Sequence, residues 1–283
     1  MAGTLTLVGT PIGNLSDLPP RAQTALSECD FIAAEDTRVT LKLLNHLNIK
    51  KPMISYYEHN KRERGEEICS RIILGQNCAL VTDAGMPAIS DPGEDLVALC
   101  CEYGIKVQVV PGPSAVITAL AVSGLPAGRF TFEGFLSVNK RNRREHLAEL
   151  KCEHRTMVFY EAPHKLTATL KDLLHSLGDR RVTIARELTK LHEEVIYTTL
   201  KQATEKYRTM QPRGEFVLII EGAPQQQKVE ITADQAATIA YDLVKQGHST
   251  SEAAKQAANQ TGVKKSEIYR LICKKIENRA DLL

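Results

Sequence analysis

The stretch Asp83-Ala84-Gly85-Met86-Pro87-Ala88-Ile89-Ser90-Asp91-Pro92-Gly93 decides how this chain folds. It follows the apolar run 78–81, typical of a buried strand, and precedes the run 96–99, typical of a helix face. Ligands of α/β folds bind at the carboxyl edge of the sheet, where such loops lie. The stretch therefore predicts a ligand-binding loop. A plain strand-to-helix turn, with Pro92 opening the helix, is the alternative.

Three other strand-like runs in the first 120 residues end in similar loops. These loops are Gly9–Asn14, Glu35–Arg38 and Pro111–Ala115, and helical patterns such as residues 64–74 lie between the strands. Alternating strands and helices predict a largely parallel sheet whose loops gather at one edge. We therefore expect an N-terminal α/β domain, residues 1–120, with four loops around one site.

A second α/β domain is predicted for residues 121–224. Strands are legible at 156–160, 182–185 and 216–220, and a helix from His164 to His175 follows Pro163, which is typical of a first helical turn. The ends of these strands are again polar. Two consecutive α/β domains predict a cleft between them.

Residues 225–283 form the third predicted unit. A polar linker over 224–227 precedes helical patterns from Thr232 to Lys275, with a capped helix start at Ser249 and a turn around Gly262. The pattern resembles a helix-turn-helix module, and a small capping bundle is the alternative. The cations around its last helix are Lys264, Lys265, Arg270, Lys274 and Lys275.

A denser group of cations lies in the second domain. It consists of Lys140, Arg141, Arg143 and Arg144. Such density favours contact with phosphates, and a solvated helix start is the alternative. Because a basic residue at a helix N-terminus opposes the helix dipole, we expect a partner outside the helix to use these charges.

The bulk composition restricts the class of protein. The chain has 283 residues, 43% of them hydrophobic, and its net charge of +2 is too small to indicate a nucleic-acid binder without local clusters. Its seven cysteines show no metal-ligand spacing and favour free thiols in a reducing compartment. No stretch is typical of a signal peptide or a membrane span. We therefore expect a cytoplasmic protein without a metal or a membrane partner.

Seven motifs at the strand ends form a recognisable set: Val8–Leu15, Glu35–Arg38, Thr82–Gly93, Pro111–Ala115, Tyr160–His164, Ala185–Glu194 and Gly214–Phe216. Together they resemble the tetrapyrrole methylase superfamily of S-adenosylmethionine-dependent methyltransferases. Within it, the chain resembles the small-subunit ribosomal RNA methyltransferase I family, which methylates a cytidine ribose 2′-hydroxyl in 16S rRNA. The resemblance covers residues 3–222, and the tail is similar to that family's helical module. It implies two α/β domains with the cofactor between them, and a homodimer.

The resemblance also implies the residues that hold S-adenosylmethionine. They are Pro11, Asp83, Gly85, Met86, Pro87, Ala88, Ser114, Ala115, Tyr160, Leu188 and Gly214. Small residues and free backbone groups suit such a ligand because the main chain can approach it closely. Many members of the superfamily have an acidic residue where this chain has Met86. Backbone amides and Asp83 are the two alternatives for holding the amino-acid end of the cofactor.

Methyl transfer to a hydroxyl requires in-line placement and removal of the hydroxyl proton. The candidates on the predicted loops are Glu35, Asp36, Arg38, Glu161, His164, Arg186, Glu187, Lys190 and His192. We expect Asp36 or Glu187 to accept the proton, Arg38 and Arg186 to orient ribose and phosphate, and Lys190 to belong to the catalytic set. Each candidate is also explained by a strand-end ion pair or a helix cap.

The predicted partner is 16S rRNA within the small ribosomal subunit. The predicted contacts are Lys140, Arg141, Arg143, Arg144, Lys264, Lys265, Arg270 and Lys274. With eight Tyr, six Phe and no Trp, recognition should depend on RNA shape and phosphate contacts. A precorrin-type or diphthine-type methyltransferase and a non-enzymatic RNA-binding protein are the alternatives.

Overall fold

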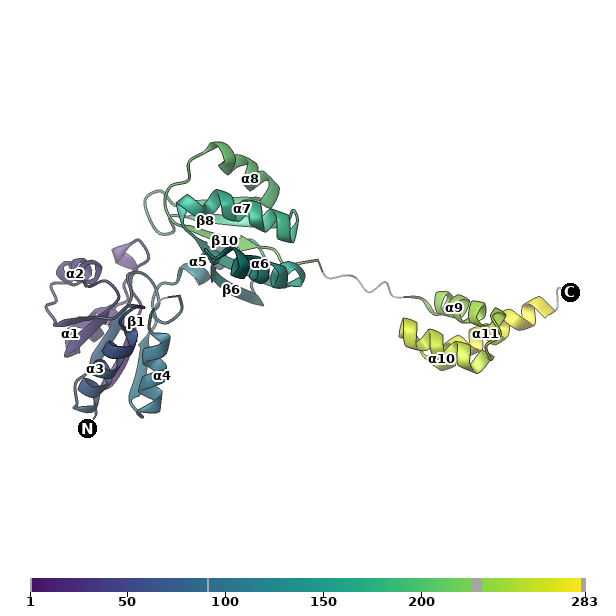
Figure 1. The fold of residues 1–283 in the computed structure, drawn as a ribbon, viewed down its shortest axis with the longest axis horizontal. Helices are drawn as coiled ribbons and strands as arrows, with labels where there is room; N and C mark the ends of the chain where they lie inside the picture. Colours follow the sequence, from purple (N-terminus) through teal and green to yellow (C-terminus); the bar gives the residue numbers. More distant parts are fainter. Residues whose placement is uncertain (1, 91, 225–230, 281–283) are drawn as a thin grey trace. The chain divides into compact units, whose positions relative to one another are not determined.

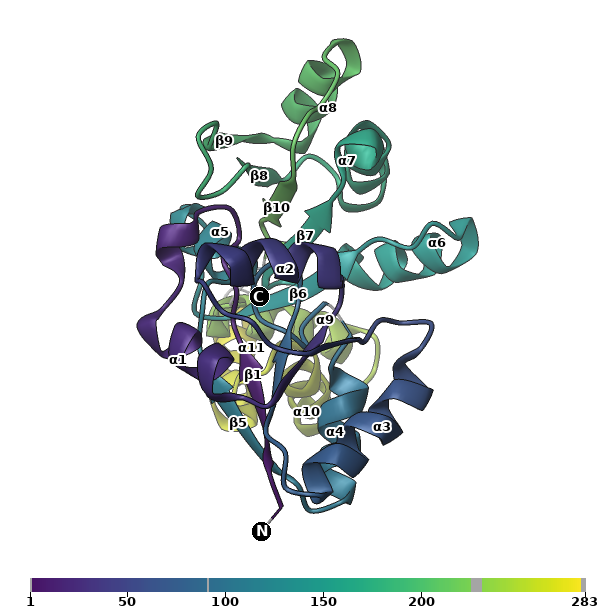
Figure 2. The same ribbon diagram turned by 90° about the vertical axis from the view of Figure 1, so that its left-hand side faces the viewer.

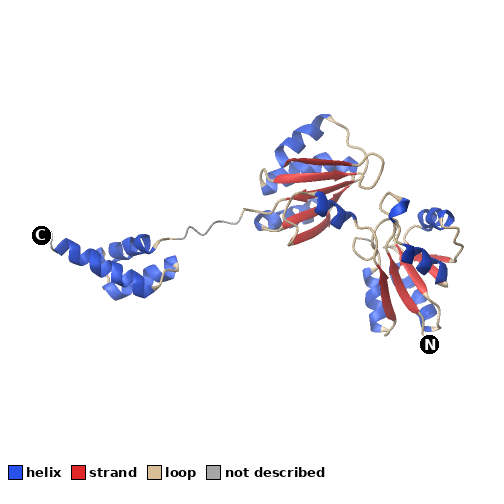
Figure 3. Ribbon diagram, turned by 180° about the vertical axis from the view of Figure 1, so that it is seen from behind, coloured by secondary structure: helices blue, strands red, loops and turns tan. Residues whose placement is uncertain are grey.

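The computed structural model describes residues 2–90, 92–224 and 231–280, and the side chains of 277–280 are not described. By its internal contacts the chain divides into a larger unit, residues 1–223, and a smaller unit, residues 224–283. Figures 1 and 3 show the helices and strands of both units. The predicted linker residues 225–227 lie outside the described part of the chain.

The first sheet of the larger unit is parallel throughout, in the order β3-β2-β4-β1-β5. Its strands are β1 (Thr4–Val8), β2 (Phe31–Ala34), β3 (Met53–Ser55), β4 (Cys78–Val81) and β5 (Lys106–Val110). The predicted parallel sheet is confirmed, although the sequence analysis missed the short edge strand β3. Because all its strands run in one direction, the loops after β1, β2, β4 and β5 leave the same edge.

Helices cover both faces of this sheet, as Figure 2 shows in the lower half of the view. On one face, α1 (Pro20–Glu28) and α2 (Thr37–His46) pack against the sheet. On the other face lie α3 (Lys61–Ile73) and α4 (Glu94–Glu102). Every residue of β2 and β4 is buried, as expected for parallel strands covered on both sides. A 3-10 turn, η1 (Leu15–Asp17), follows the first loop. Helix α4 begins at Glu94 after Gly93, so Pro92 does not open it.

The second sheet is mixed, in the order β6-β7-β10-β8-β9, with only β6 and β7 parallel. Its strands are β6 (Phe130–Phe135), β7 (Thr156–Glu161), β8 (Arg181–Arg186), β9 (Glu194–Thr199) and β10 (Phe216–Ile220). On one face pack α6 (Lys140–Glu149), η2 (Leu150–Cys152), α7 (Pro163–Leu177) and α8 (Leu200–Thr209). The predicted helix after Pro163 is confirmed, whereas β9 and α8 were missed. On the opposite face packs α5 (Ala115–Val122), whose Val116, Ala119 and Leu120 contact Val217 and Ile219.

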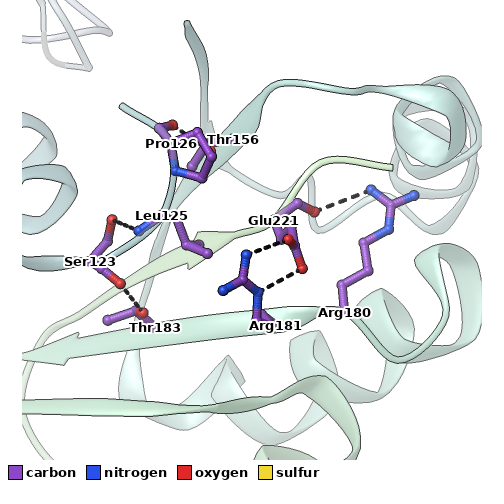
Figure 4. A network of polar contacts seen from close by, with 8 residues as sticks. All are labelled: Ser123, Leu125, Pro126, Thr156, Arg180, Arg181, Thr183 and Glu221. Carbon is purple, nitrogen blue, oxygen red and sulfur yellow. Dashed lines mark hydrogen bonds and ion pairs between the residues drawn. The ribbon is translucent and has the colours of Figure 1, made fainter. Parts of the chain in front are cut away.

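Hydrogen bonds fix the segment after α5 to the second sheet (Figure 4). The Thr183 hydroxyl donates to the carbonyl of Ser123, and the Thr156 hydroxyl donates to the carbonyl of Pro126, both at 2.7 Å. The same view shows the ion pair between Arg181 and Glu221, which joins two further strand ends. Helix α5, which begins directly after Ser114, is thereby held against β10.

The smaller unit consists of α9 (Ala233–Lys245), α10 (Thr250–Thr261) and α11 (Lys265–Ala280). Small residues of α9 and α10 let Ile268 and Ile272 of α11 pack between them. The predicted cap at Ser249 is present as a capping box with Glu252, and Gly262 ends α10 with a left-handed φ of +76°. The predicted helical module is confirmed.

Candidate functional site

A cavity of about 580 Å³ lies between the loops of the first sheet and the strand ends of the second sheet. The residues that line it from the first sheet and its loops are Ile12, Glu35, Thr82, Asp83, Ala84, Gly85, Met86, Ile89, Ser90, Ser114 and Ala115. The residues that line it from the second sheet and its loops are Phe135, Tyr160, Glu161, Ala162, Pro163, His164, Ala185, Leu188, Glu215, Phe216 and Val217. The four predicted loops thus meet at one cavity, together with the ends of β6, β7, β8 and β10.

Backbone contacts join the loops after β1, β4 and β5. The N–H of Thr10 donates to the carbonyl of Gly85 at 2.9 Å, and the N–H of Gly85 donates back at 3.1 Å. A Cβ on Gly9 would lie 2.7 Å from the Cα of Gly112. Glycine is therefore required where the loops after β1 and β5 cross.

Met86 fills the junction between these loops. A Cβ on Gly9 would also lie 2.7 Å from the sulfur of Met86, so this side chain packs against the backbone of the first loop. Methionine suits such an irregular space because its side chain is flexible and apolar. Met86, at the position where the resemblance implies an acidic residue in many relatives, thus has a packing partner.

Glu35 and Asp83 form an acidic pair in the wall of the cavity. The Thr82 hydroxyl donates to Glu35 at 2.6 Å, and the backbone N–H of Asp36 donates to Asp83 at 3.2 Å. Burial and the neighbouring charge of Glu35 raise the pKa of Asp83. A carboxylate with a raised pKa is a better proton acceptor than an unperturbed one.

Asp36 caps helix α2 and does not line the cavity. It accepts hydrogen bonds from the backbone N–H of Arg38 at 2.8 Å and from the Arg38 guanidinium at 2.6 Å. The hydrogen bond from the Arg38 side chain is the main reason that the pKa of Asp36 falls to about 2. Arg38 itself is 87% exposed. The prediction that Asp36 accepts a proton stays a prediction.

Glu187, Lys190 and Glu215 form an ion-paired group beside the cavity. The Lys190 ammonium lies 3.0 Å from a carboxylate oxygen of each glutamate, and the backbone N–H of Glu215 donates to Glu187 at 2.9 Å. Burial raises the pKa of Glu187, but the hydrogen bonds from Glu215 and Lys190 outweigh it and lower the pKa overall. Of the three residues, only Glu215 lines the cavity.

The loop that carries this group is backbone-strained. Glu187 and Thr189 have φ angles of +52° and +65°, which non-glycine residues seldom adopt. A Cβ on Gly13 would lie 2.5 Å from Cγ of Lys190, and a Cβ on Gly214 would lie 2.6 Å from Cγ of Glu187. Strain of this kind concentrates at ligand sites, where the surrounding packing holds it.

Glu161 connects the cavity to the basic helix α6. Its carboxylate accepts hydrogen bonds from the backbone N–H of Ala162 at 2.8 Å and from the hydroxyl of Thr169. Thr169 accepts in turn from Arg143 of α6 at 2.9 Å, and Arg143 pairs with Asp172 at 2.7 Å. This chain of contacts gives Arg143 a buried partner, Thr169, and a half-exposed partner, Asp172.

The predicted cofactor residues fall into two groups. The cavity is lined by Asp83, Gly85, Met86, Ser114, Ala115, Tyr160 and Leu188. Pro11, Pro87, Ala88 and Gly214 do not line it, but each is adjacent in sequence to a residue that does. Four residues of the cavity wall were not predicted as site residues: Ile12, Ile89, Phe135 and Val217. Phe135 had a detectable signal, because it is an aromatic residue just before the basic run.

The predicted catalytic residues Asp36, Arg38, Arg186, Glu187 and Lys190 do not line the cavity. Arg186 donates to the carbonyl of Arg213 at 2.6 Å and lies 3.5 Å from Glu194. Three other candidates, Glu35, Glu161 and His164, do line it. The titratable groups at the cavity are therefore different from the ones that the sequence analysis favoured.

The predicted RNA contacts differ in exposure. On α6, Lys140, Arg141 and Arg144 are exposed, whereas the Arg143 side chain is 15% exposed. Arg141 pairs with Glu145 on the same helix at 2.8 Å. In the smaller unit, Lys264, Lys265, Arg270 and Lys274 are all exposed. Both groups thus present cations at the surface of their own unit.

Two further observations concern other classes of site. Within the described residues, no group of three or more His, Cys, Asp or Glu side chains could hold a metal ion. The helices in that same part of the chain include none that is long and apolar enough to cross a bilayer.

Comparison with known proteins defines the class. The sequence profile of the Tetrapyrrole (Corrin/Porphyrin) Methylases matches residues 4–204. The solved structure of the methyltransferase CobJ is similar with a TM-score of 0.60 and 20% identity, over 78% of this chain and 95% of that one. The solved structure of diphthine synthase is similar with a TM-score of 0.59 and 13% identity, over 78% of this chain and 90% of that one. The fold is therefore that of a tetrapyrrole methylase.

Closer relatives define the family. The Ribosomal RNA small subunit methyltransferase I of Synechocystis is 47% identical over 270 residues, 95% of this chain and 97% of that protein. The protein of the same name from Thermotoga maritima is 50% identical over 220 residues, 78% of this chain and 99% of that protein. The chain belongs to the ribosomal RNA small subunit methyltransferase I family of tetrapyrrole methylases. The family resemblance, the fold class and the expectation of a methyltransferase enzyme are confirmed.

Proposed function

We propose that this chain transfers a methyl group from S-adenosylmethionine to the 2′-hydroxyl of a cytidine ribose in 16S rRNA. Its substrate is the small ribosomal subunit in the cytoplasm. One observation carries the proposal: the motif loops that resemble the superfamily's cofactor loops surround a single cavity. The chain is also 47% identical, over 95% of its length, to a protein named as a small-subunit rRNA methyltransferase.

The cavity fits S-adenosylmethionine in size and chemistry. Its volume of about 580 Å³ lies within the range of about 300–1,000 Å³ that is usual for small-molecule sites. Ile12, Met86 and Leu188 supply apolar wall, and the φ of +88° at Gly85 leaves backbone groups without a covering side chain. Glu35 supplies a carboxylate that suits an ammonium group or ribose hydroxyls.

When bound, S-adenosylmethionine supplies an electrophilic methyl group on a positively charged sulfur. The chain's own task is to place the hydroxyl and to accept its proton. The contacts favour Asp83 as the acceptor, because it lines the cavity and its pKa is raised by burial and by Glu35. Asp36 and Glu187, the residues favoured by sequence, have pKa values lowered by their partners.

Contact with rRNA is proposed for the exposed cations of α6 and α11. Lys140 and Arg144 of α6 lie in the segment that follows Phe135 at the cavity. Each phosphate that such a cation neutralises releases counterions, which favours binding. Because sequence-selective RNA enzymes act on unpaired nucleotides, we propose that the target cytidine is splayed out of its RNA context.

A second copy of this chain is the proposed partner of the apolar surface of α5. Ile117 and Val122 of this helix are 56% and 39% exposed, although Val116, Ala119 and Leu120 pack with Val217 and Ile219 of β10. Tyr197 of β9 is 66% exposed and donates from its hydroxyl to the carbonyl of Val122 at 2.9 Å. Exposed apolar groups gathered in this way are typical of protein interfaces. Sedimentation equilibrium should give a dimer, and a monomeric mass contradicts this partner.

Methyl transfer from tritiated S-adenosylmethionine tests the proposed function. The substrates to compare are 30S subunits, free 16S rRNA, a precorrin and a diphthine precursor protein. We expect label in the ribose of a cytidine of 16S rRNA, with 30S subunits as the better substrate. Label only in the precorrin or the protein contradicts the rRNA assignment and favours a precorrin-type or diphthine-type methyltransferase. Binding to 30S subunits without any transfer supports a non-enzymatic RNA-binding protein.

A further inference from the structure

Phe135 is an exposed aromatic side chain in the wall of the cavity. All six phenylalanines lie in the described residues, and Phe31, Phe159 and Phe216 are at most 2% exposed. Phe130 and Phe132 are half-buried, whereas Phe135 is 57% exposed. Phe135 thus leaves a large apolar surface in contact with water in the wall of the cavity, five residues before α6.

A β-bulge in β6 turns Phe135 toward the cavity. Side chains alternate along a strand, so residues 132 and 135 would normally point to opposite faces. Phe132 pairs with Val158 and Phe135 pairs with Tyr160, so three steps along β6 match two steps along β7. The extra residue brings both rings to Tyr160, with centroid separations of 5.0 Å and 5.6 Å. Bulges beside active sites commonly redirect a side chain in this way.

The bulge is also connected to the basic helix. Glu133 lies within the register shift, and one of its carboxylate oxygens is 2.8 Å from Nε2 of His146 on α6. Arg143 attaches the same helix to Asp172 on α7. These two contacts hold α6 next to the end of β6 while Lys140 and Arg144 remain exposed. An aromatic face at the cavity is therefore followed directly by cations suited to an RNA backbone.

The geometry points to Phe135 as the side chain on which the target cytosine stacks when its ribose enters the cavity. An unpaired base has an exposed π face, and proteins that bind single-stranded RNA usually supply an aromatic side chain for it. Tyr160 packs edge-on against Phe135 at an interplanar angle of 61°, which supports the ring from the side of the sheet. Stacking at this position gives a chain with few aromatic residues a base contact in addition to phosphate contacts.

This inference rests on the proposed rRNA methylation, so the experiment starts with the wild-type chain and 30S subunits. Phe135→Ala, Phe135→Leu and Phe135→Tyr are compared by methyl transfer, and binding of S-adenosylhomocysteine is measured by calorimetry. Val138→Ala is the matched control, because Val138 is 78% exposed near α6 and does not line the cavity.

We expect Phe135→Ala and Phe135→Leu to lower kcat/KM for 30S subunits by about 5- to 150-fold, the range given by one aromatic stack. Phe135→Tyr keeps the ring and should recover the activity that Phe135→Ala loses, Val138→Ala should keep wild-type activity, and all four variants should bind S-adenosylhomocysteine as the wild type does. Retained activity of Phe135→Ala overturns the stacking role and leaves the proposed function standing. A parallel loss of S-adenosylhomocysteine affinity overturns it by assigning Phe135 to the cofactor. A wild-type chain that does not label 30S subunits overturns both proposals.

Discussion

Asp83 is the carboxyl group whose surroundings best suit a proton acceptor. It lines the cavity, and burial together with Glu35 raises its pKa. Only the ionised form can accept the proton, so kcat should fall as the pH drops through this pKa. Asp83→Asn should lower kcat by about 10²- to 10⁴-fold, the usual contribution of a general base, and abolish that acid limb. Single-turnover methylation of 30S subunits across pH measures both effects.

Asp36→Asn is the matched control for Asp83. The pKa of Asp36 is about 2, so its titration lies below the pH range of the assay, and the amide keeps an oxygen for the helix cap. The variant should retain the fall of kcat at low pH.

Stability gives a second readout for Asp83: its folded pKa lies above its unfolded pKa, so stability falls as the pH rises through that window. Asp83→Asn should therefore raise Tm at pH 7. An unchanged acid limb in Asp83→Asn contradicts its assignment as the base.

Gly112 is required by the crossing of the loops after β1 and β5. A Cβ at this position would lie 2.8 Å from Cα of Gly9 and 2.9 Å from its carbonyl carbon. Gly112→Ala should destabilise the larger unit by about 1–3 kcal/mol, because backbone has to move away from the added methyl group. Urea unfolding measures the change, with Gly128→Ala as control since nothing lies within 4 Å of a Cβ there. Equal midpoints for the two variants contradict the close approach.

The sequence predicted which loops meet at the site but not which side chains face it. Strand ends rich in glycine and proline are local signals, and the parallel sheet brings them together. The role of Asp36 as a helix cap was open from the sequence, whereas the partner of Arg143 was not. Asp36 is used by its own helix start, whereas Arg143 pairs with Asp172, 29 residues further along the chain. The contact between Arg143 and Asp172 appears only after α6 and α7 have packed on the second sheet.

At the level of elements, the missed strands are edge strands. β3 and β9 lie at the ends of their sheets, and the half-exposed pattern of β9 lacks regular alternation. A strand that is covered on one side only can carry polar residues at most positions, so its sequence resembles a loop. The central strands β2, β4 and β10 are buried throughout, and their apolar runs were recognised.

Helix α6 combines an inward arginine with outward ones, and the two kinds should respond differently to substitution. Arg143→Ala removes the pair with Asp172 and the hydrogen bond to Thr169, and should lower the free energy of unfolding by about 1–3 kcal/mol. Arg144 is exposed and, within the described residues, donates to a carbonyl of its own helix at 3.3 Å. Arg144→Ala should leave stability unchanged and reduce the salt dependence of 30S binding by about one counterion.

Urea unfolding and filter binding at several salt concentrations measure these two effects. The same loss of 30S affinity in both variants, with no loss of stability in Arg143→Ala, contradicts the inward role of Arg143. An unchanged salt slope in Arg144→Ala contradicts the contact between α6 and a phosphate.

At the scale of the whole molecule, the two units have separate cores. The core of the smaller unit consists of alanines of α9 and α10 packed against Ile268 and Ile272. The match with the Thermotoga maritima relative covers 99% of that protein but only 78% of this chain. A protein with the same name thus lacks an equivalent of about a fifth of this chain, which is the share that the smaller unit occupies.

Removal of residues 224–283 should separate cofactor binding from substrate binding. The cavity is built entirely from residues 12–217, so the truncated chain should bind S-adenosylhomocysteine with the affinity of the full chain. Loss of Lys264, Lys265, Arg270 and Lys274 should raise the KM for 30S subunits and reduce its salt dependence by up to about four counterions. Calorimetry and methyl transfer at limiting 30S concentration measure the two effects.

A full chain in which these four cations are replaced by Gln serves as the control, because it keeps α9, α10 and α11. An unchanged KM in both variants contradicts a role for the smaller unit in binding rRNA, and a loss in the truncated chain alone assigns that role to its fold rather than its charge.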